Sequence, residues 1–297
     1  MHVLVTGGTG FIGSALLPVL RKEGHQLTVL TRQARGGEED LQYIQSLDEI
    51  ASDTVIGAVV NLAGASLAGA RWTARYKREI VNSRLDTTQA LVDMMARLAS
   101  PPDVFLSASA IGYYGHHGDE RLDETGSSVA GFSQGLCAQW EALAMKAELD
   151  LGVRTCIMRL GVVLDASGGA FQQMAQPFKM GVGNWVGDGR QWLSWVHLLD
   201  VVRAIQFLLE DTSLSGAFNL TAPEPVTSKG FCRAMQSHYR TLVRIPMPAA
   251  VMKLALGEMA QELLISGQRV LPAHLEQAGF QFQYPVLDEA LAKIKSA

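Results

Sequence analysis

The fold of this chain is constrained most by its first thirteen residues, MHVLVTGGTGFIG. A run of mainly Val and Leu from His2 to Thr6 predicts a strand that is buried on both faces of a parallel sheet. Glycines follow at positions 7, 8, 10 and 13, and apolar residues at helical spacing begin at Phe11. A strand, a tight glycine turn and a helix N-terminus form a pyrophosphate site, because the backbone approaches the phosphate closely and the helix dipole favours negative charge. The alternative is a plain structural turn.

Size and charge argue against several classes of protein. The 297 residues can bury a large core, as one domain or as a main domain with a smaller one. A net charge of −4 gives no reason to expect a nucleic-acid or membrane surface, although a local patch is compatible with it. The first residues lack the pattern of a signal peptide. Three distant cysteines without metal-ligand spacing favour a reducing cytoplasm and no metal site: Cys137, Cys156 and Cys232.

The residues after the second predicted strand, Gln26 to Leu30, indicate which dinucleotide the turn binds. NAD-binding folds place an acidic residue on the ribose 2′-hydroxyl about 20 residues beyond the glycines. This chain has Thr31-Arg32 there. An arginine pairs with a 2′-phosphate, which a carboxylate would repel, so we predict NADP rather than NAD, with Arg35 in a supporting role. The alternative is that Arg32 lies in solvent at the end of the strand.

Strand and helix patterns alternate along the first half of the chain and predict an α/β doubly wound parallel sheet. Further strands are expected at 42–44, 57–62, 104–106 and 153–160, with helices at 72–99 and 132–149. We predict a dinucleotide-binding domain over 1–164, with returns to the sheet near 196–220. Residues 165–297 form a substrate-side region, with a glycine- and tryptophan-rich loop at 181–195 and a mainly helical C-terminal part.

Two polar clusters have ordinary explanations. Arginines and lysines between Arg71 and Arg84 suggest a nucleic-acid face, but in an acidic chain they are better explained as a solvated helix surface. The adjacent His116 and His117 lack partners at ligand spacing and are interpreted as loop residues. His197 is interpreted as a structural histidine at a strand–helix junction.

Several motifs in order resemble the extended short-chain dehydrogenase/reductase family, which contains the NAD-dependent epimerases and dehydratases. They are Val5–Gly13, Asn61–Gly64, Ser107–Ser109, Arg159–Leu164, Val196–Asp200 and Phe218–Leu220. The stretches Trp72–Arg84, Trp140-Glu141 and Gly267–Phe280 are similar to an atypical subfamily of epimerase family proteins, of the bacterial YfcH type. That resemblance implies NADP as the ligand and a C-terminal module of unknown function from about residue 245.

The same resemblance implies roles for individual residues. The pyrophosphate would lie against Gly7, Gly10, Phe11, Ile12 and Gly13, and the adenosine phosphate against Thr31 and Arg32. Leu62, Ala63 and Gly64 would follow the adenosine ribose and pyrophosphate, with Glu79 and Arg84 near the cofactor. Ser109 matches the catalytic serine, which hydrogen-bonds the reacting oxygen.

The acid/base pair of the family, Tyr-x-x-x-Lys, is replaced here by Ser133 and Cys137. A serine hydroxyl is a far weaker acid than a tuned phenol, and cysteine carries no positive charge. Tyr113 or Tyr114 would supply a phenol from the adjacent loop, provided that its pKa falls by roughly three units, about 4 kcal/mol. The alternative is that both tyrosines form an aromatic wall.

These observations predict an NADP-dependent oxidoreductase, or an epimerase that uses transient hydride transfer on a sugar-nucleotide-like substrate. The loss of the Tyr/Lys pair motivates a second hypothesis, a catalytically silent NADP-binding protein that reports cofactor state to a partner. No nucleic-acid or membrane partner is expected, and the substrate and oligomeric state stay open.

Overall fold

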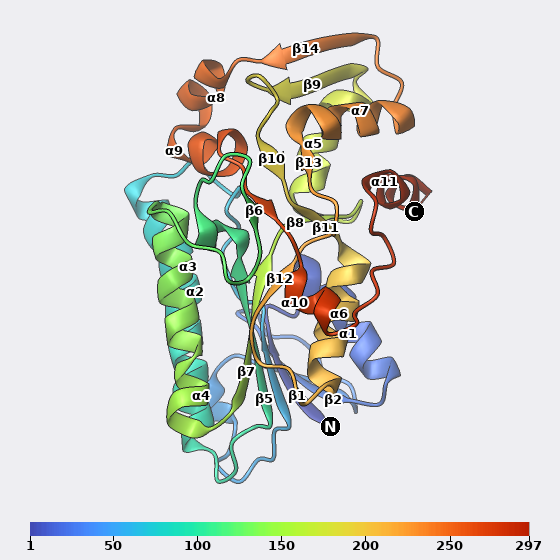
Figure 1. The fold of residues 1–297 in the computed structure, drawn as a ribbon. Helices are drawn as coiled ribbons and strands as arrows, with labels where there is room; N and C mark the ends of the chain where they lie inside the picture. Colours follow the sequence, from blue (N-terminus) through green and yellow to red (C-terminus); the bar gives the residue numbers. More distant parts are fainter. Residues whose placement is uncertain (297) are drawn as a thin grey trace.

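Seven parallel strands form the central sheet of the computed structural model, which describes residues 1–296 (Figure 1). The sheet order is β12-β7-β5-β4-β1-β2-β3. The strands are β1 (His2–Thr6), β2 (Gln26–Leu30), β3 (Leu41–Ile44), β4 (Ala58–Asn61), β5 (Val104–Ala110), β7 (Arg154–Leu160) and β12 (Gly216–Leu220). The chain leaves β1 toward β2 and later returns to its other side as β4, so the switch point of the sheet lies between β1 and β4.

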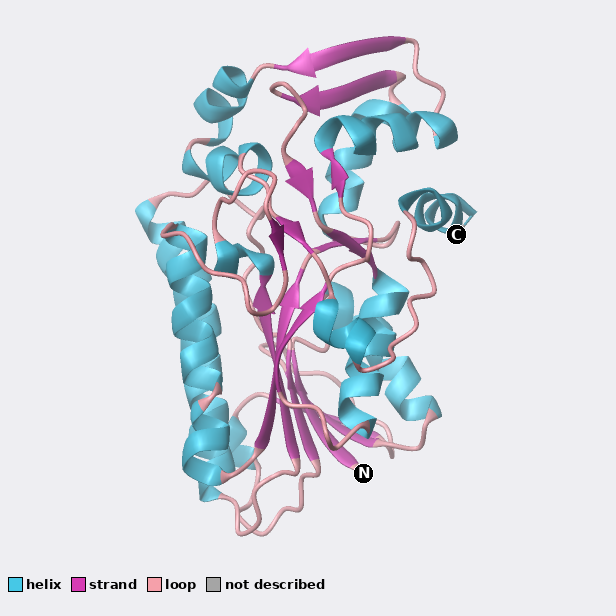
Figure 2. Cartoon of the chain, in the orientation of Figure 1, coloured by secondary structure: helices cyan, strands magenta, loops and turns pink. Residues whose placement is uncertain are grey.

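Helices cover both faces of this sheet, as Figure 2 shows. On one face lie α1 (Phe11–Lys22) and α6 (Leu198–Glu210), and on the other lie α2 (Ala74–Arg97), α3 (Phe132–Ala144) and α4 (Lys146–Leu151). Successive residues of β1 point to opposite faces, so Val3 and Val5 belong to the core under α1 and α6, while Leu4 belongs to the core under α2 and α4. The predicted doubly wound α/β fold is confirmed.

Apart from α6, β12 and α10 (Ala273–Gln277), the second half of the chain lies over the carboxyl ends of the central strands (Figure 1). Its strands form pairs: β11 (Trp195–His197) with β8 (Val162–Leu164), β10 (Trp192–Leu193) with β13 (Val226–Thr227), β14 (Val243–Met247) with β9 (Val182–Val186), and β15 (Arg269–Val270) with β6 (Arg121–Leu122). Its helices are α5 (Gly169–Lys179), α7 (Ser228–His238), α8 (Ala249–Leu256), α9 (Glu258–Ala260), α10 (Ala273–Gln277) and α11 (Leu287–Ser296). Short helical turns are η1 (Leu47–Glu49), η2 (Ile111–Tyr114) and the π-turn η3 (Gln261–Ile265).

Three local predictions were wrong. The helix expected over 132–149 is divided into α3 and α4 at Met145, and the loop expected over 181–195 contains strands β9 and β10 and the start of β11. In the expected mainly helical part, β14 is a strand although it contains Pro246. Proline is tolerated there because β14 pairs with β9 along one edge only.

None of the helices within residues 1–296 has the length and apolar character needed to cross a bilayer.

Candidate functional site

The glycine turn after β1 lies at the switch point of the sheet and packs tightly against the loop that follows β4. Gly7 has a positive φ of 69°, and a Cβ there would lie 2.5 Å from the carbonyl oxygen of Leu62. A Cβ on Gly13 would lie 2.4 Å from the carbonyl oxygen of Gly7. Only glycine fits these two positions, and Gly10, the N-cap of α1, supplies no side chain to the first N–H groups of that helix.

Phe11 and Ile12 open α1 and point in different directions. Ile12 packs against the core under α1 and α6. The ring of Phe11 lies across the crevice against Gly168 and Gly169, where added Cβ atoms would come within 2.7 and 2.6 Å of it. The glycine turn therefore faces the loop after β8, a contact that the sequence did not indicate.

The cation predicted to recognise a 2′-phosphate is exposed at the end of β2. Within residues 1–296, the guanidinium of Arg32 forms no ion pair and no hydrogen bond, while its carbonyl oxygen accepts from the Gln45 side chain at 3.3 Å. Thr31 is half-buried, and its backbone N–H donates to the carbonyl of Ile44 at 2.9 Å. Arg35 lies over the Tyr43 ring, with its guanidinium carbon 5.9 Å from the ring centroid.

A buried amide joins the carboxyl ends of β1 and β4 to helices α2 and α3. Asn61 accepts from Thr6 Oγ1 at 2.7 Å and donates to Thr88 Oγ1 at 2.9 Å. Thr88 also accepts from the Trp140 indole at 2.9 Å. This network fixes the half-buried Leu62 and Ala63 and the exposed Gly64, which line the predicted floor of the crevice.

Arg84 points from α2 toward that floor. Its guanidinium donates to the carbonyls of Ile80 and Ala65, each at 3.0 Å, and a Cβ on Gly64 would lie 2.9 Å from its Cζ. Burial lowers the pKa of Arg84, and no described carboxylate pairs with it. Arg84 is therefore a half-buried cation that is held by two backbone carbonyls and by the Trp140 ring, whose centroid lies 5.3 Å from its Cζ. By contrast, Glu79 is exposed on α2, and its carboxylate forms no hydrogen bond or ion pair with the residues that the structure describes.

Ser109 lies at the end of β5 in a buried, charged network. Its hydroxyl donates to Glu141 Oε1 at 2.6 Å. Arg159 donates to the same carboxylate from Nε at 3.0 Å and from Nη2 at 2.9 Å. Since the hydroxyl proton of Ser109 is directed at Glu141, the Ser109 oxygen keeps lone pairs that can accept a hydrogen bond.

The two tyrosines after Ser109 occupy different environments. Tyr114 is fully buried; it donates to Asn219 Oδ1 at 2.7 Å and accepts from Arg159 Nη1 at 3.0 Å. Burial raises the pKa of Tyr114 to about 12, opposite to the direction that a base requires, so this position favours the aromatic-wall alternative. Tyr113 is half-buried, with the Arg159 guanidinium carbon 3.6 Å from its ring centroid.

The positions of the missing acid/base pair lie on one face of α3, one turn apart. Ser133 packs against Gly112, where a Cβ would lie 3.0 Å from its own Cβ. Cys137 is buried beside Ser109, and burial, aided by the Glu141 carboxylate, raises the pKa of its thiol to about 11. A carboxylate from the C-terminal part reaches this helix, since Ser133 N–H donates to Glu262 Oε2 at 3.2 Å.

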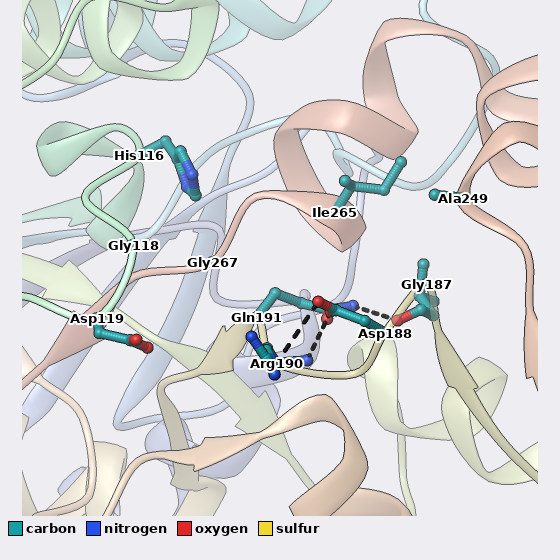
Figure 3. Close-up of a pocket in the computed structure, with 11 residues that line it drawn as sticks. His116, Gly118, Asp119, Gly187, Asp188, Arg190, Gln191, Ala249, Ile265 and Gly267 are labelled. Carbon is teal, nitrogen blue, oxygen red and sulfur yellow. Dashed lines mark hydrogen bonds and ion pairs between the residues drawn. The ribbon is translucent and has the colours of Figure 1, made fainter.

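A cavity of about 410 Å³ lies on the substrate side of the molecule (Figure 3). Figure 3 shows that one wall comes from the loop after η2, with His116 and Asp119, and another from the β9–β10 connection, with Asp188 and Arg190. Ala249, Ile265 and Gly267 complete the lining. Gly267 is required here, because a Cβ would lie 2.2 Å from the carbonyl oxygen of Trp192.

Comparisons with known proteins agree with this arrangement. The model of the NAD dependent epimerase/dehydratase family matches residues 3–220, and a domain of unknown function (DUF1731) matches residues 247–294. An epimerase family protein of Mycobacterium bovis, Mb2239, is 38% identical over 97% of this chain and 96% of its own length. YfhF of Bacillus subtilis, also an epimerase family protein, is 35% identical over 99% of this chain and 98% of its own length.

Among solved structures, the human epimerase family protein SDR39U1, crystallised with NADPH, superposes with a TM-score of 0.88 and 31% identity. The match covers 100% of this chain and 99% of the human one. The chain belongs to the NAD-dependent epimerase/dehydratase family, as an atypical extended short-chain dehydrogenase/reductase.

Proposed function

We propose that this chain is an NADP(H)-binding oxidoreductase, or an epimerase that uses transient hydride transfer, acting on a sugar-nucleotide-like substrate. The observation that carries the proposal is the glycine turn at the switch point, where Gly7 and Gly13 leave space that a Cβ would fill. In open α/β sheets, ligands bind outside the carboxyl ends of the strands at this point. The NADPH in the human relative and the UDP-sugars in several structures of the same fold support the choice of ligands.

On this proposal, the chain divides into a cofactor side over 1–164, completed by β12, and a substrate side over 165–297. Gly7, Gly10, Phe11, Ile12 and Gly13 hold the pyrophosphate, and Thr31 and Arg32 hold the 2′-phosphate. Leu62, Ala63 and Gly64 follow the adenosine ribose and pyrophosphate, with Glu79 near the cofactor. The cavity of Figure 3 receives the part of the substrate that is remote from the reacting carbon.

Arg84 compensates for the cation missing at position 137. It lies against Gly64, and its charge acts on the Cys137 thiol, although it comes from α2 and not from α3. A half-buried guanidinium without a carboxylate partner favours an anion beside it. We assign it to the negative charge of the cofactor or of the substrate.

Ser109 hydrogen-bonds the reacting hydroxyl of the substrate. Its own side chain is positioned by Glu141, which Arg159 holds in place. Because its hydroxyl donates a hydrogen bond to Glu141, Ser109 accepts one from a substrate alcohol, and the Tyr113 ring stacks on the Arg159 guanidinium beside it. The bound nicotinamide would supply the hydride chemistry.

The cofactor assignment is tested by calorimetry on the native chain and on Arg32→Ala. We expect Arg32→Ala to weaken NADPH binding by at least about tenfold, because a charge-assisted pair with the 2′-phosphate is lost, and to leave NADH binding nearly unchanged. Arg78→Ala, which removes an exposed arginine of α2, is the control. Equal weakening of both nucleotides would show that Arg32 does not read the 2′-phosphate.

A second candidate function, a cofactor-binding protein without turnover, is favoured by Ser133, by Cys137 and by the raised pKa of Tyr114. NADP⁺ reduction is followed with a panel of sugar nucleotides and alcohols. The enzymatic proposal requires turnover that falls by about two orders of magnitude or more in Ser109→Ala. NADPH binding without turnover of any compound would favour the silent protein.

A further inference from the structure

Within residues 1–296, eleven large apolar side chains are exposed, and six of them lie on one rim of the molecule. The rim follows the end of α5, the segment before β14, β14 itself and α8, at the upper end of Figure 1. Its members are Met180, Leu242, Val243, Ile245, Val251 and Leu254. Leu242 and Leu254 are 78% and 82% exposed, so the fold gives them almost no cover. We call these six residues the apolar rim.

Contacts join the end of α5 to β14. Val243 to Met247 pairs in parallel with Val182 to Val186, and a Cβ on Gly181 would lie 3.7 Å from Leu242. The chain then passes directly into α8, in which no residue is buried. An exposed apolar helix beside an exposed strand marks an interaction surface, because isolated chains rarely leave such area in water.

The charged residues within the segments that form the apolar rim are all cationic. Lys179, Arg240, Arg244 and Lys253 are exposed, and none of them forms an ion pair with a residue in 1–296. From Tyr239 to Gly257 the sequence contains no Asp or Glu, although the whole chain has a net charge of −4. Lysines and arginines next to exposed Leu, Val and Ile are the composition of segments that lie in the interface of an anionic bilayer.

A second copy of the chain fits this surface less well. A two-fold contact through the rim would bring the same unpaired cations toward each other. Pro246 has no N–H to donate, so it interrupts strand pairing along the free edge of β14.

We propose that the apolar rim and its four cations dock this protein peripherally on a membrane surface that carries anionic lipids. Ala249, which begins α8, also lines the cavity of Figure 3, so docking places that cavity beside the bilayer.

The test is flotation of the purified chain with vesicles of phosphatidylcholine alone or mixed with phosphatidylglycerol, at low and high salt. We expect binding to the anionic vesicles only, and weaker binding at high salt. Leu254→Ser should reduce the bound fraction, and Arg244→Gln should weaken the partition about fivefold. The matched controls, Leu149→Ser in α4 and Arg78→Gln in α2, remove an equally exposed leucine or an exposed arginine elsewhere and should bind as the native chain does.

The proposal is overturned if the native chain binds neither kind of vesicle, or if the control variants lose vesicle binding to the same extent as the rim variants. Sedimentation of the native chain and of Leu254→Ser is measured in parallel. A native dimer that Leu254→Ser converts to monomer would assign the rim to a second copy and not to lipid. Unchanged thermal unfolding of each variant shows that the fold is intact.

Discussion

Glu141 and Arg159 form a buried ion pair. Arg159 is 4% and Glu141 is 9% exposed, and both oxygens of the carboxylate accept from the guanidinium. Each charge depends on the other, because an unpaired buried ion is costly. Lys77 and Glu258 form an ion pair of similar length, 2.8 Å, at the surface, where water and salt weaken the attraction.

Because one pair is buried and the other is at the surface, we expect a Glu→Gln substitution to lower the free energy of unfolding by different amounts in the two pairs. Glu141→Gln should lower the free energy of unfolding by about 3–5 kcal/mol, because it leaves the Arg159 guanidinium buried without a counter-charge. Glu258→Gln should cost no more than about 1 kcal/mol. Urea titrations of both variants measure the effect. Equal, small losses would contradict the buried pair.

His197 gives the fold a pH dependence of its own. Its Nδ1 accepts from the N–H of Leu199 at 3.1 Å and caps α6, so the proton of the neutral ring lies on Nε2, which has no hydrogen-bond partner among the described residues. Burial lowers the pKa of His197 below 6.5. The unfolded chain therefore takes up the proton first, and this contribution to stability is complete above about pH 7.5 and declines as pH falls below about 6.5.

We therefore expect the unfolding free energy to fall as the pH drops below about 6.5, by at most about 1.4 kcal/mol per pH unit for this group. His197→Asn keeps an N-capping side chain but cannot titrate, so its stability should vary less over the same interval. His116→Asn, in the exposed loop, should keep the native pH dependence. A native-like slope in His197→Asn would exclude the histidine as its origin.

At the scale of elements, the strand–turn–helix unit at the start of the chain was predictable because its signals are local. Each signal lies within a few residues: the apolar composition of a buried strand, the glycines, and then the helical periodicity. β1 and α1 have the predicted positions. The strand β14 was missed, since its exposed residues and Pro246 lack the pattern of a buried strand. The contacts Ser109–Glu141 and Ser133–Glu262 join residues 32 and 129 positions apart, for which no local signal exists.

The glycine turn itself can be tested with one methyl group. Gly7→Ala should destabilise the fold by at least about 1–2 kcal/mol, because φ is positive and the Cβ meets the Leu62 carbonyl at 2.5 Å. It should also weaken NADPH binding. Gly135→Ala, where a Cβ meets nothing within 4 Å inside α3, should be neutral or stabilising by up to about 1 kcal/mol. Thermal unfolding of both variants decides whether the close approach is real.

For the molecule as a whole, the order of strand and helix patterns predicted the fold class, whereas net charge did not predict the distribution of charge on the surface. The alternation of strands and helices was enough to predict a doubly wound sheet, and the described structure has that topology. A net charge of −4 is an average, and it conceals four unpaired cations beside the apolar rim. The substrate side is assembled from segments that are distant in sequence. For example, the Trp192 indole donates a hydrogen bond to Asp119 at 2.8 Å, and no local pattern predicts the cavity that such contacts form.

The central claim is that a dinucleotide with a 2′-phosphate lies across the turn at the end of β1. Calorimetric titration of the native chain with NADPH and with NADH tests it most directly. We expect saturable binding of one nucleotide per chain, with NADPH the tighter ligand. Absence of saturable heat with both nucleotides would contradict it.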